Sequence, residues 1–450
     1  MLKQISQILE LSTIHAIPNI IRSNNLVLKF LWLFCFIGSS SVCAWFIFNN
    51  ISKYFQYDVV SKIDIKYETS LIFPVVSICD LNPLTTNESK NYYKQIYRTE
   101  YPDFIYLDEL MVRLKSNSTN QHLYGKNLID YIVSCEFLSS QCNLDQDFDS
   151  YFDINYGNCI RFNSGTNFKG EKVKQKFVSN TGVWNSLDLE IFIGSSIQNT
   201  NIFSKKNGLN ILISNSSTDS LYGEGINISP GTSTNVFLNK YSIVKQPYPY
   251  SECINDLTSI SSHDSECFKK LITFKSTYIY DDCVRMCYQK LLSNNCKCQS
   301  AIYGYVYNDS LRKCLLDKSQ DKNDSKCMYD NWEKLTKNSS ILKECNCPFE
   351  CEFNGYQYTT SFSEFPTKYY FDFLINKSSF IKKKYSNISY EELKRSVAKI
   401  QIFYDDLKQT IVSQEVKIDL GDMVSNIGGT LGLFLGNLFD IYHLKASLIE

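Results

Sequence analysis

Two long stretches without formal charge lie far apart in the chain. The first, Phe30 to Ile51, has 22 residues and is long enough to cross a bilayer as a helix. The second lies between Asp422 and Asp440, where 17 residues carry no charge, near the lower limit for a spanning helix. Its glycines recur every fourth residue and would form one smooth helical stripe for close backbone contact: Gly428, Gly432 and Gly436. A glycine-rich helix that simply faces lipid is the alternative.

The first stretch is predicted to be a permanent anchor. Val42-Cys43-Ala44 resembles a signal-peptide cleavage site, which keeps a cleaved leader open as the alternative. However, 29 residues precede the apolar run, and signal peptides have an apolar core of only about 7 to 15 residues. We place residues 1–27 in a cytoplasmic N-terminus, the first transmembrane helix at 28–51 and the second at 422–445.

Between these stretches, short β-branched and aromatic runs bounded by turn residues predict strands. These runs are Ser70–Ile78, Leu187–Ile193, Leu209–Ser214 and Ile400–Tyr404. Two helices are predicted, Asp281–Leu292 from its spacing of apolar residues and Tyr390–Ala398 from a capping-box pattern that begins at Ser389. The predicted fold class is therefore α+β, a membrane protein with two transmembrane helices flanking a large β-rich domain.

Charge and histidine content exclude several functions. The chain has 46 basic and 47 acidic residues, so no net field favours nucleic acid. Four scattered histidines, with no phosphate loop and no nucleophile motif, give no enzyme constellation. We expect no catalytic residues, no resident cofactor and no metal site.

The cysteines indicate an oxidising compartment. Of 17 cysteines, 15 lie between positions 79 and 351. Cys283 and Cys287 are one helical turn apart and can be tied to the Cys345/Cys347 pair by a two-rung disulfide ladder. A zinc site is the alternative, but the histidines of this segment lie outside the cysteine cluster.

Asn-x-Ser/Thr sequons indicate which side of the membrane this segment occupies. Ten occur, including one at Asn50, and none lies near either end of the chain. We therefore expect residues 52–421 to be extracellular and both termini cytoplasmic. The candidate glycosylation sites are Asn87, Asn117, Asn215, Asn227, Asn308, Asn323, Asn338, Asn376 and Asn387.

Several motifs, in order, resemble the landmarks of the degenerin/epithelial sodium channel family, which includes acid-sensing and FMRFamide-peptide-gated channels. The motifs are Tyr54-Phe-Gln-Tyr57, Phe73-Pro-Val-Val-Ser-Ile-Cys79, Tyr156-Gly-Asn-Cys-Ile-Arg-Phe-Asn-Ser-Gly165, the cysteine ladder and Ile427-Gly-Gly-Thr-Leu-Gly-Leu-Phe-Leu-Gly436. The resemblance covers nearly the whole chain. It implies an amiloride-sensitive-type, sodium-selective cation channel in the plasma membrane, a homo- or hetero-trimer with related subunits, gated by an extracellular peptide or by protons.

The resemblance also implies the disulfides and the shape of the extracellular domain, a hand holding a ball with a helical thumb at about 253–351. The implied pairs are Cys79–Cys159, Cys135–Cys142, Cys253–Cys351, Cys283–Cys347, Cys287–Cys345, Cys296–Cys327 and Cys298–Cys314. Cys267 is left over, either free or bridging to another chain.

Gating residues are implied in the same way. In acid-sensing relatives a tyrosine after the first span touches a tryptophan before the thumb, and the matching positions here are Tyr54 and Tyr250. Ordinary core packing is the alternative for this pair. A His-Gly pair that shapes the cytoplasmic mouth corresponds to His15 and Ala16. Ser425 matches the small residue at which bulky substitutions hold degenerin channels open.

The pore departs from the family pattern. The family's selectivity turn, Gly-x-Ser, is replaced by Gly436, Asn437 and Leu438, after the packing glycines Gly428, Gly429 and Gly432. From Asn437 onward the chain differs from the family, so we expect an apparently truncated pore helix followed by a stub at 446–450. Asp440 as a genuine pore charge is the alternative. A non-conducting modulatory subunit, a truncated isoform and a two-span receptor are the competing functions.

Overall fold

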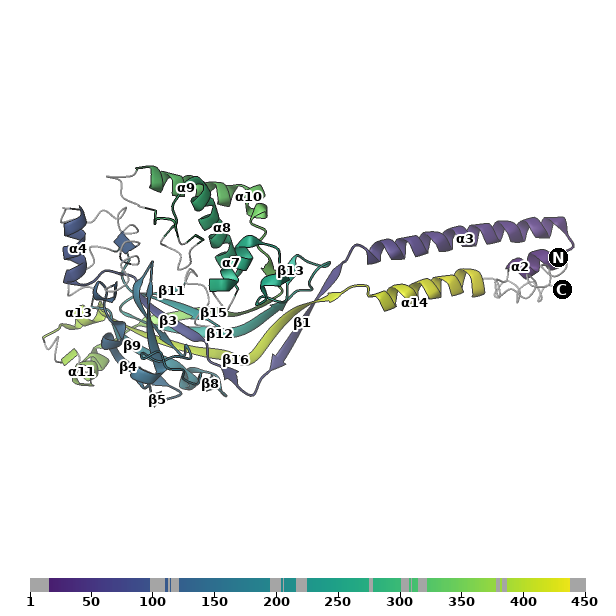
Figure 1. Ribbon diagram of the computed structural model, residues 1–450. Coiled ribbons are helices and arrows are strands. Elements are labelled where there is room, and N and C mark those ends of the chain that lie inside the picture. The colour runs from purple at the N-terminus through teal and green to yellow at the C-terminus, as the bar shows by residue number, and fades with distance from the viewer. Residues whose placement is uncertain are drawn as a thin grey trace. The chain divides into compact units, whose positions relative to one another are not determined.

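Figure 1 shows the computed structural model. The structure describes residues 16–97, 110–111, 114, 121–194, 204, 206–215, 225–274, 278–300, 307–308, 310–314, 322–377, 381–382 and 387–437. The chain divides into two compact units. The helical unit comprises Met1–Lys62, Gln246–Glu252 and Ser413–Glu450, and the sheet unit comprises Ile63–Lys245 and Cys253–Val412.

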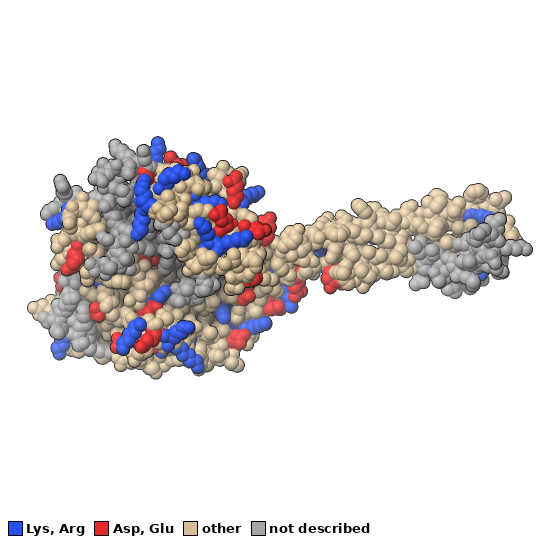
Figure 2. All heavy atoms as spheres, viewed as in Figure 1, with Lys and Arg blue, Asp and Glu red and all other residues tan. Residues whose placement is uncertain are grey.

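The helical unit is dominated by one long apolar helix, α3 (Leu26–Tyr54), which begins at the N-cap Asn25. It is the one helix of the described chain that is long and apolar enough to span a membrane. Most of its large apolar side chains are exposed, and Figure 2 shows almost no charged side chains along it. The other elements are α2 (Ala16–Arg22), α14 (Leu420–Leu431) and the π-helix η7 (Gly432–Asn437).

The sheet unit contains two main sheets and two small ones. The seven-stranded sheet has the order β15-β12-β16-β9-β4-β5, with β1 paired to β16, and the five-stranded sheet has the order β11-β10-β3-β7-β6. The strands of the first are β1 (Val59–Tyr67), β4 (Ile132–Phe137), β5 (Ser140–Gln141), β9 (Leu187–Phe192), β12 (Thr232–Val244), β15 (Glu352–Glu364) and β16 (Val397–Val416). Those of the second are β3 (Val75–Asp80), β6 (Phe148–Asp153), β7 (Gly157–Phe162), β10 (Leu209–Ser214) and β11 (Ile226–Ile228). The small sheets pair β2 (Leu71–Ile72) with β8 (Phe177–Val178) and β13 (Cys253–Ile254) with β14 (Phe349–Glu350).

The two main sheets share one apolar core. Ile78 and Phe162 of the five-stranded sheet lie in the same buried cluster as Leu189, Leu238 and Ile400 of the seven-stranded sheet. Along β12, side chains at alternate positions are buried, as expected for strands that cover a core with one face. This burial stabilises the scaffold on which the helices sit.

Helices pack around these sheets with smaller cores of their own. Figure 1 shows those of the segment expected to be the thumb, which are α7 (Glu266–Phe274), α8 (Tyr280–Asn295), α9 (Lys322–Lys337) and α10 (Ser339–Glu344). Their side chains contribute to a separate buried cluster. The remaining helices are α4 (Asn87–Tyr97), α6 (Leu144–Asp147), α11 (Lys368–Lys377) and α13 (Tyr390–Lys394), with 3-10 turns η2 (Gln121–Leu123), η3 (Leu128–Tyr131), η4 (Val183–Asn185) and η6 (Ile260–Ser262).

Most expected elements lie where the pattern places them, and two need correction. The expected strand Ser70–Ile78 is two strands, β2 and β3, separated at Phe73 and Pro74. The helix expected over Tyr390–Ala398 ends at Lys394, although its capping box at Ser389 is present. It stops early because Val397 and Ala398 are fully buried in β16.

Candidate functional site

The helical unit holds α3 and α14 side by side (Figure 1). Among the contacts that join α3 to α14 and to η7, which continues it, Asn50 Nδ2 donates to the carbonyl oxygen of Met423 at 3.1 Å, Cys43 Sγ lies 4.0 Å from the carbonyl oxygen of Thr430, and Phe46 stacks on Phe434 of η7 at 5.6 Å between ring centroids. Asn50, near the C-terminal end of α3, meets Met423 near the start of α14, whereas Cys43 and Phe46, earlier in α3, meet Thr430 and Phe434 farther along the chain, so the helices are antiparallel. Asn50 is thus a polar link between two apolar helices, the kind of contact that holds helices together in membranes.

The opposite face of α14 is built from small residues. Met423, Ile427, Thr430 and Phe434 are half-buried and recur at the spacing of one helix face, which is the face toward α3. Ser425, Gly428 and Gly432 are exposed and lie about half a turn away from that face. A side chain added at Gly428, Gly429 or Gly432 would meet nothing within 4 Å. The small face is therefore open to a neighbouring backbone.

The expected selectivity residues fall at the limit of the described chain. Gly436 and Asn437 form the end of the π-helix η7. Leu438 and Asp440 lie outside the described residues, as does His15 at the other end. Ala16 begins α2 and is buried.

Beyond the end of α3, an aromatic pair joins the helix exit to the 246–252 segment. The ring of Tyr57 meets the ring of Tyr250 edge to face, with centroids 5.5 Å apart. Tyr54 was the expected partner of Tyr250; in the structure its ring lies 6.3 Å from Tyr57 and it is Tyr57 that contacts Tyr250. The chain leaves α3 after Tyr54 and turns, with Tyr57 at φ 52°, and this turn carries the later ring toward Tyr250.

Polar contacts tie the same region to the start of α14. The backbone N–H of Lys417 donates to the carbonyl oxygen of Asp58 at 3.0 Å, and the Lys417 ammonium pairs with the Asp58 carboxylate at 2.9 Å. Gln246 Nε2 donates to the carbonyl oxygen of Gln414 at 2.8 Å, and the Gln246 backbone N–H donates to Gln414 Oε1 at 3.2 Å. We name residues 54–58, 246–252 and 413–419 the wrist. The wrist links three separate segments of the helical unit.

The sheet unit contains seven disulfides, and they are the seven pairs that the resemblance implies. They are Cys79–Cys159, Cys135–Cys142, Cys253–Cys351, Cys283–Cys347, Cys287–Cys345, Cys296–Cys327 and Cys298–Cys314. Cys283 and Cys287 lie on α8 and form a two-rung ladder to the segment after α10. Cys267 is free and buried, and burial raises the pKa of its thiol to about 11, so the thiol stays protonated at neutral pH.

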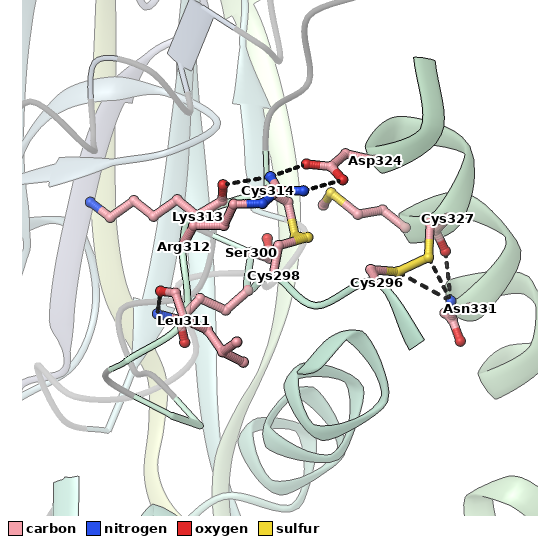
Figure 3. Close-up of a disulfide and its surroundings, with 12 residues drawn as sticks. Cys296, Cys298, Ser300, Leu311, Arg312, Lys313, Cys314, Asp324, Cys327 and Asn331 are labelled. Carbon is pink, nitrogen blue, oxygen red and sulfur yellow. Dashed lines mark hydrogen bonds and ion pairs between the residues drawn. A yellow bond between two sulfur atoms is a disulfide. The ribbon is translucent and has the colours of Figure 1, made fainter. Parts of the chain in front are cut away.

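Figure 3 shows two of these disulfides, Cys296–Cys327 and Cys298–Cys314, which join the chain just after α8 to α9 and to the segment before α9. Asn331 of α9 donates to the carbonyl oxygen of Cys327 at 2.7 Å, beside the Cys296–Cys327 bridge. Arg312 forms two hydrogen bonds with the Asp324 carboxylate, at 2.5 and 2.9 Å. The Asp324 side chain is 6% exposed, so it is part of this packing rather than a solvated surface charge.

A second ionic group joins α7 to α8. Lys290 Nζ lies 2.7 Å from Glu266 Oε2, and the Tyr307 hydroxyl donates to the other oxygen of Glu266. The hydrogen bond from Lys290, followed by that from Tyr307, lowers the pKa of Glu266. The carboxylate therefore remains ionised through mild acidification.

The sequons divide according to local structure. Asn50 lies in α3, and its amide donates a hydrogen bond to the carbonyl oxygen of Met423, so its side chain lies at the contact between α3 and α14. Asn87, Asn215, Asn227, Asn308, Asn338, Asn376 and Asn387 are exposed, whereas Asn117 lies outside the described residues and the side chain of Asn323 is not described. Sequence patterns alone did not distinguish Asn50, because a sequon carries no information on whether the amide is already bonded.

Comparison with known proteins covers nearly the whole chain. The family model described as "Amiloride-sensitive sodium channel" matches residues 8–437. The chain is 25% identical to the bile acid-sensitive ion channel of Mus musculus over 96% of this chain and 85% of the relative. It is 24% identical to acid-sensing ion channel 1 of Gallus gallus, over 94% of this chain and 79% of the relative. It is 22% identical to the FMRFamide-activated amiloride-sensitive sodium channel of Cornu aspersum, over the same two shares.

The family expected from the motifs is thereby confirmed. Its members are membrane cation channels that assemble as trimers, and they are not enzymes. The chain belongs to the amiloride-sensitive sodium channel family.

Proposed function

We propose that this chain is a subunit of a sodium-selective, amiloride-sensitive trimeric channel of the plasma membrane, with α3 and α14 as its two spans. The observation that supports this best is the arrangement of α14. One face packs on α3, and over the described side chains of residues 421–434 the opposite face presents Ser425 and glycines. Three copies of such a face can approach a common axis closely, which is what a pore wall requires.

The selectivity region in this proposal is Gly436-Asn437-Leu438. Backbone carbonyls can coordinate a dehydrated cation without help from side chains, so replacement of the family's serine by Leu438 does not by itself prevent selection. Gly428, Gly429 and Gly432 would pack the pore helices, and His15 with Ala16 would shape the cytoplasmic mouth. The extracellular domain would extend over 52–421, with both termini in the cytoplasm.

Gating in this proposal passes through the thumb and the wrist. The ladder on α8 makes the thumb stiff, and the Tyr57–Tyr250 pair joins the residues just before the thumb to the exit of α3. The named relatives respond to different stimuli, since one is bile acid-sensitive, one acid-sensing and one FMRFamide-activated. We propose an extracellular peptide or protons as the stimulus here.

Expression in oocytes tests the proposal. The chain is expressed alone, surface delivery is verified by biotinylation, and current is recorded during acid, FMRFamide-like peptides, bile acid and amiloride. Sodium current blocked by amiloride is the expected result. Proven surface expression without current under any stimulus would refute a conducting homomer.

A non-conducting modulatory subunit is the second candidate, favoured by the bulky Leu438 at the selectivity turn. Co-expression with a conducting relative distinguishes the two, because a modulatory subunit changes the partner's current without conducting alone. Leu438→Ser is the matched variant, since it restores the family's residue and should give current only if that turn is the obstacle.

A further inference from the structure

A groove in the sheet unit has no role in the pore or the wrist. It has a volume of about 540 Å³, and its lining includes residues of β4, β5 and β8. Its lining includes Phe137 at the end of β4, Leu138 of the β4–β5 turn, Lys174 before β8, Phe177 in β8 and Ser179 beyond it. The volume falls within the range of small-molecule sites, about 300 to 1,000 Å³.

The walls of the groove are held in place by several independent contacts. The Cys135–Cys142 disulfide closes the β4–β5 hairpin. Phe137 is buried, with its ring edge to face against Phe73 at 5.1 Å. Ser139 Oγ donates to the carbonyl oxygen of Trp184 at 3.0 Å, which fixes η4 to the hairpin. A pre-formed groove spares a ligand the cost of ordering its site.

The chemistry of the lining is apolar with one available cation. Phe177 is 52% exposed and Leu138 is 38% exposed, so both offer apolar surface to an occupant. Lys176 is already neutralised, because its ammonium lies 2.8 Å from Asp147. Lys174 is exposed and makes no ion pair with the described residues. No acidic residue is among those of the described chain that line the groove.

We propose that this groove binds an amphipathic organic anion, with the apolar body against Phe177 and Leu138 and the acid group at Lys174. Charge complementarity selects an anion, because the single free charge of the groove is positive and no carboxylate opposes it. The apolar walls favour a ligand with a hydrocarbon body over a simple inorganic ion. The proposal concerns binding and holds whether or not this chain conducts alone.

Photolabelling of the full chain in membranes tests it without any current measurement. The probe is a steroid carboxylate that bears a diazirine, and the labelled peptides are identified by mass spectrometry. We expect the label between residues 137 and 140 or between 174 and 185. Excess unlabelled steroid carboxylate should displace the probe, and a matched steroid alcohol probe should label this site several-fold less.

Variants of the groove distinguish specific binding of the probe from its general partition into lipid. Lys174→Gln should reduce labelling about threefold and Lys174→Glu about tenfold, since the first removes an exposed attraction and the second adds repulsion. Lys206→Glu, at an exposed lysine outside the groove, should leave labelling unchanged. Ser179→Trp fills the groove and should abolish labelling while folding is verified by surface delivery.

Three outcomes would overturn the proposal. They are equal labelling of wild type and Lys174→Glu, equal labelling by the alcohol and carboxylate probes, and a Ser179→Cys variant that cross-links to a second copy while wild type takes up no label. The last result would show that a neighbouring subunit occupies the groove.

Discussion

Removal of either ring of the Tyr57–Tyr250 pair should weaken the coupling between stimulus and pore. The rings meet edge to face at 5.5 Å and 87°, a geometry worth about 0.5 to 1.5 kcal/mol beyond area burial. If the contact exists in only one gating state, that free energy biases the gating equilibrium about 2- to 13-fold, since 1.4 kcal/mol is a factor of ten. Tyr57→Ala and Tyr250→Ala should each shift the half-activating stimulus by such a factor.

The assay is a double-mutant cycle on the half-activating stimulus, with surface expression measured for each variant. The double alanine variant should shift gating less than the sum of the single variants, with the difference equal to the pair energy. Tyr57→Phe and Tyr250→Phe retain the rings and should remain within about twofold of wild type. Tyr57→Ala keeps a non-glycine residue at φ 52°, so its effect reports the ring rather than the turn.

Two further measurements make the reasoning refutable. A cycle between Tyr54 and Tyr250 should give a coupling energy near zero. The ring that meets Tyr250 is that of Tyr57, and the Tyr54 ring packs on Tyr57 instead. Tyr248→Ala, at a ring that is 85% exposed, should leave gating unchanged. Additive effects of Tyr57→Ala and Tyr250→Ala, or stronger coupling through Tyr54, would refute the assignment.

Three other predictions concern the pore helix, the ladder and acid stability. Ser425→Val places bulk on the open face of α14 and should increase amiloride-blockable resting current several-fold, with Ser425→Ala unchanged; equal resting currents would contradict the placement of this face at the pore. Joint replacement of Cys283 and Cys347 by serine removes a bridge between residues 64 positions apart and should cost about 2 to 4 kcal/mol, measured as lower thermal stability; an unchanged unfolding temperature would show that this rung adds nothing. Folding lowers the pKa of Glu266, so the ionised carboxylate stabilises the folded state fully above the unfolded pKa of about 4.3. This stabilisation is lost as the pH falls through the lower pKa of the folded state. The stability difference between wild type and Glu266→Gln should therefore be constant from about pH 7 to pH 5.5 and shrink at lower pH; a difference that shrinks already near pH 6.5 would contradict the lowered pKa.

Local sequence patterns predicted a strand or helix correctly where only one pattern was present. Leu209–Ser214 is β10 with the expected bounds, because an apolar run between turn residues has no competing interpretation. The Ser389 capping box also forms, but the helix after it ends at Lys394. Its end was unpredictable locally, since the burial of Val397 in a strand pairing with β9 depends on residues about 200 positions earlier.

The wrist shows a different limit of sequence reasoning. Tyr54 and Tyr57 are both aromatic and three residues apart, so composition cannot choose between them as the partner of Tyr250. The choice depends on the turn after α3, where Tyr57 takes a positive φ that non-glycine residues rarely adopt. The hydrogen bond from Asn50 to Met423 could not be predicted locally either, because it depends on how far α3 and α14 overlap.

The wrist contacts have two roles. Some hold the start of α14 beside the exit of α3, and others connect the 246–252 segment to both. The Lys417–Asp58 ion pair is about half exposed at both side chains, and such pairs contribute only about 0 to 1 kcal/mol. The backbone bond from Lys417 to Asp58 does not depend on the side chain at 417, so it fixes the start of α14 beside the exit of α3 for any residue there except proline, which has no N–H to donate. Tyr250 contacts the ring of Tyr57 at the exit of α3, and Gln246, four residues earlier in the same segment, is hydrogen-bonded to Gln414. We therefore expect a displacement of the 246–252 segment to act on α14 through Gln414 and on the exit of α3 through Tyr57. Gln414→Ala and Tyr57→Ala should consequently add in their effects on gating, because they interrupt separate connections, and a strong interaction between them would show that the wrist moves as one rigid piece.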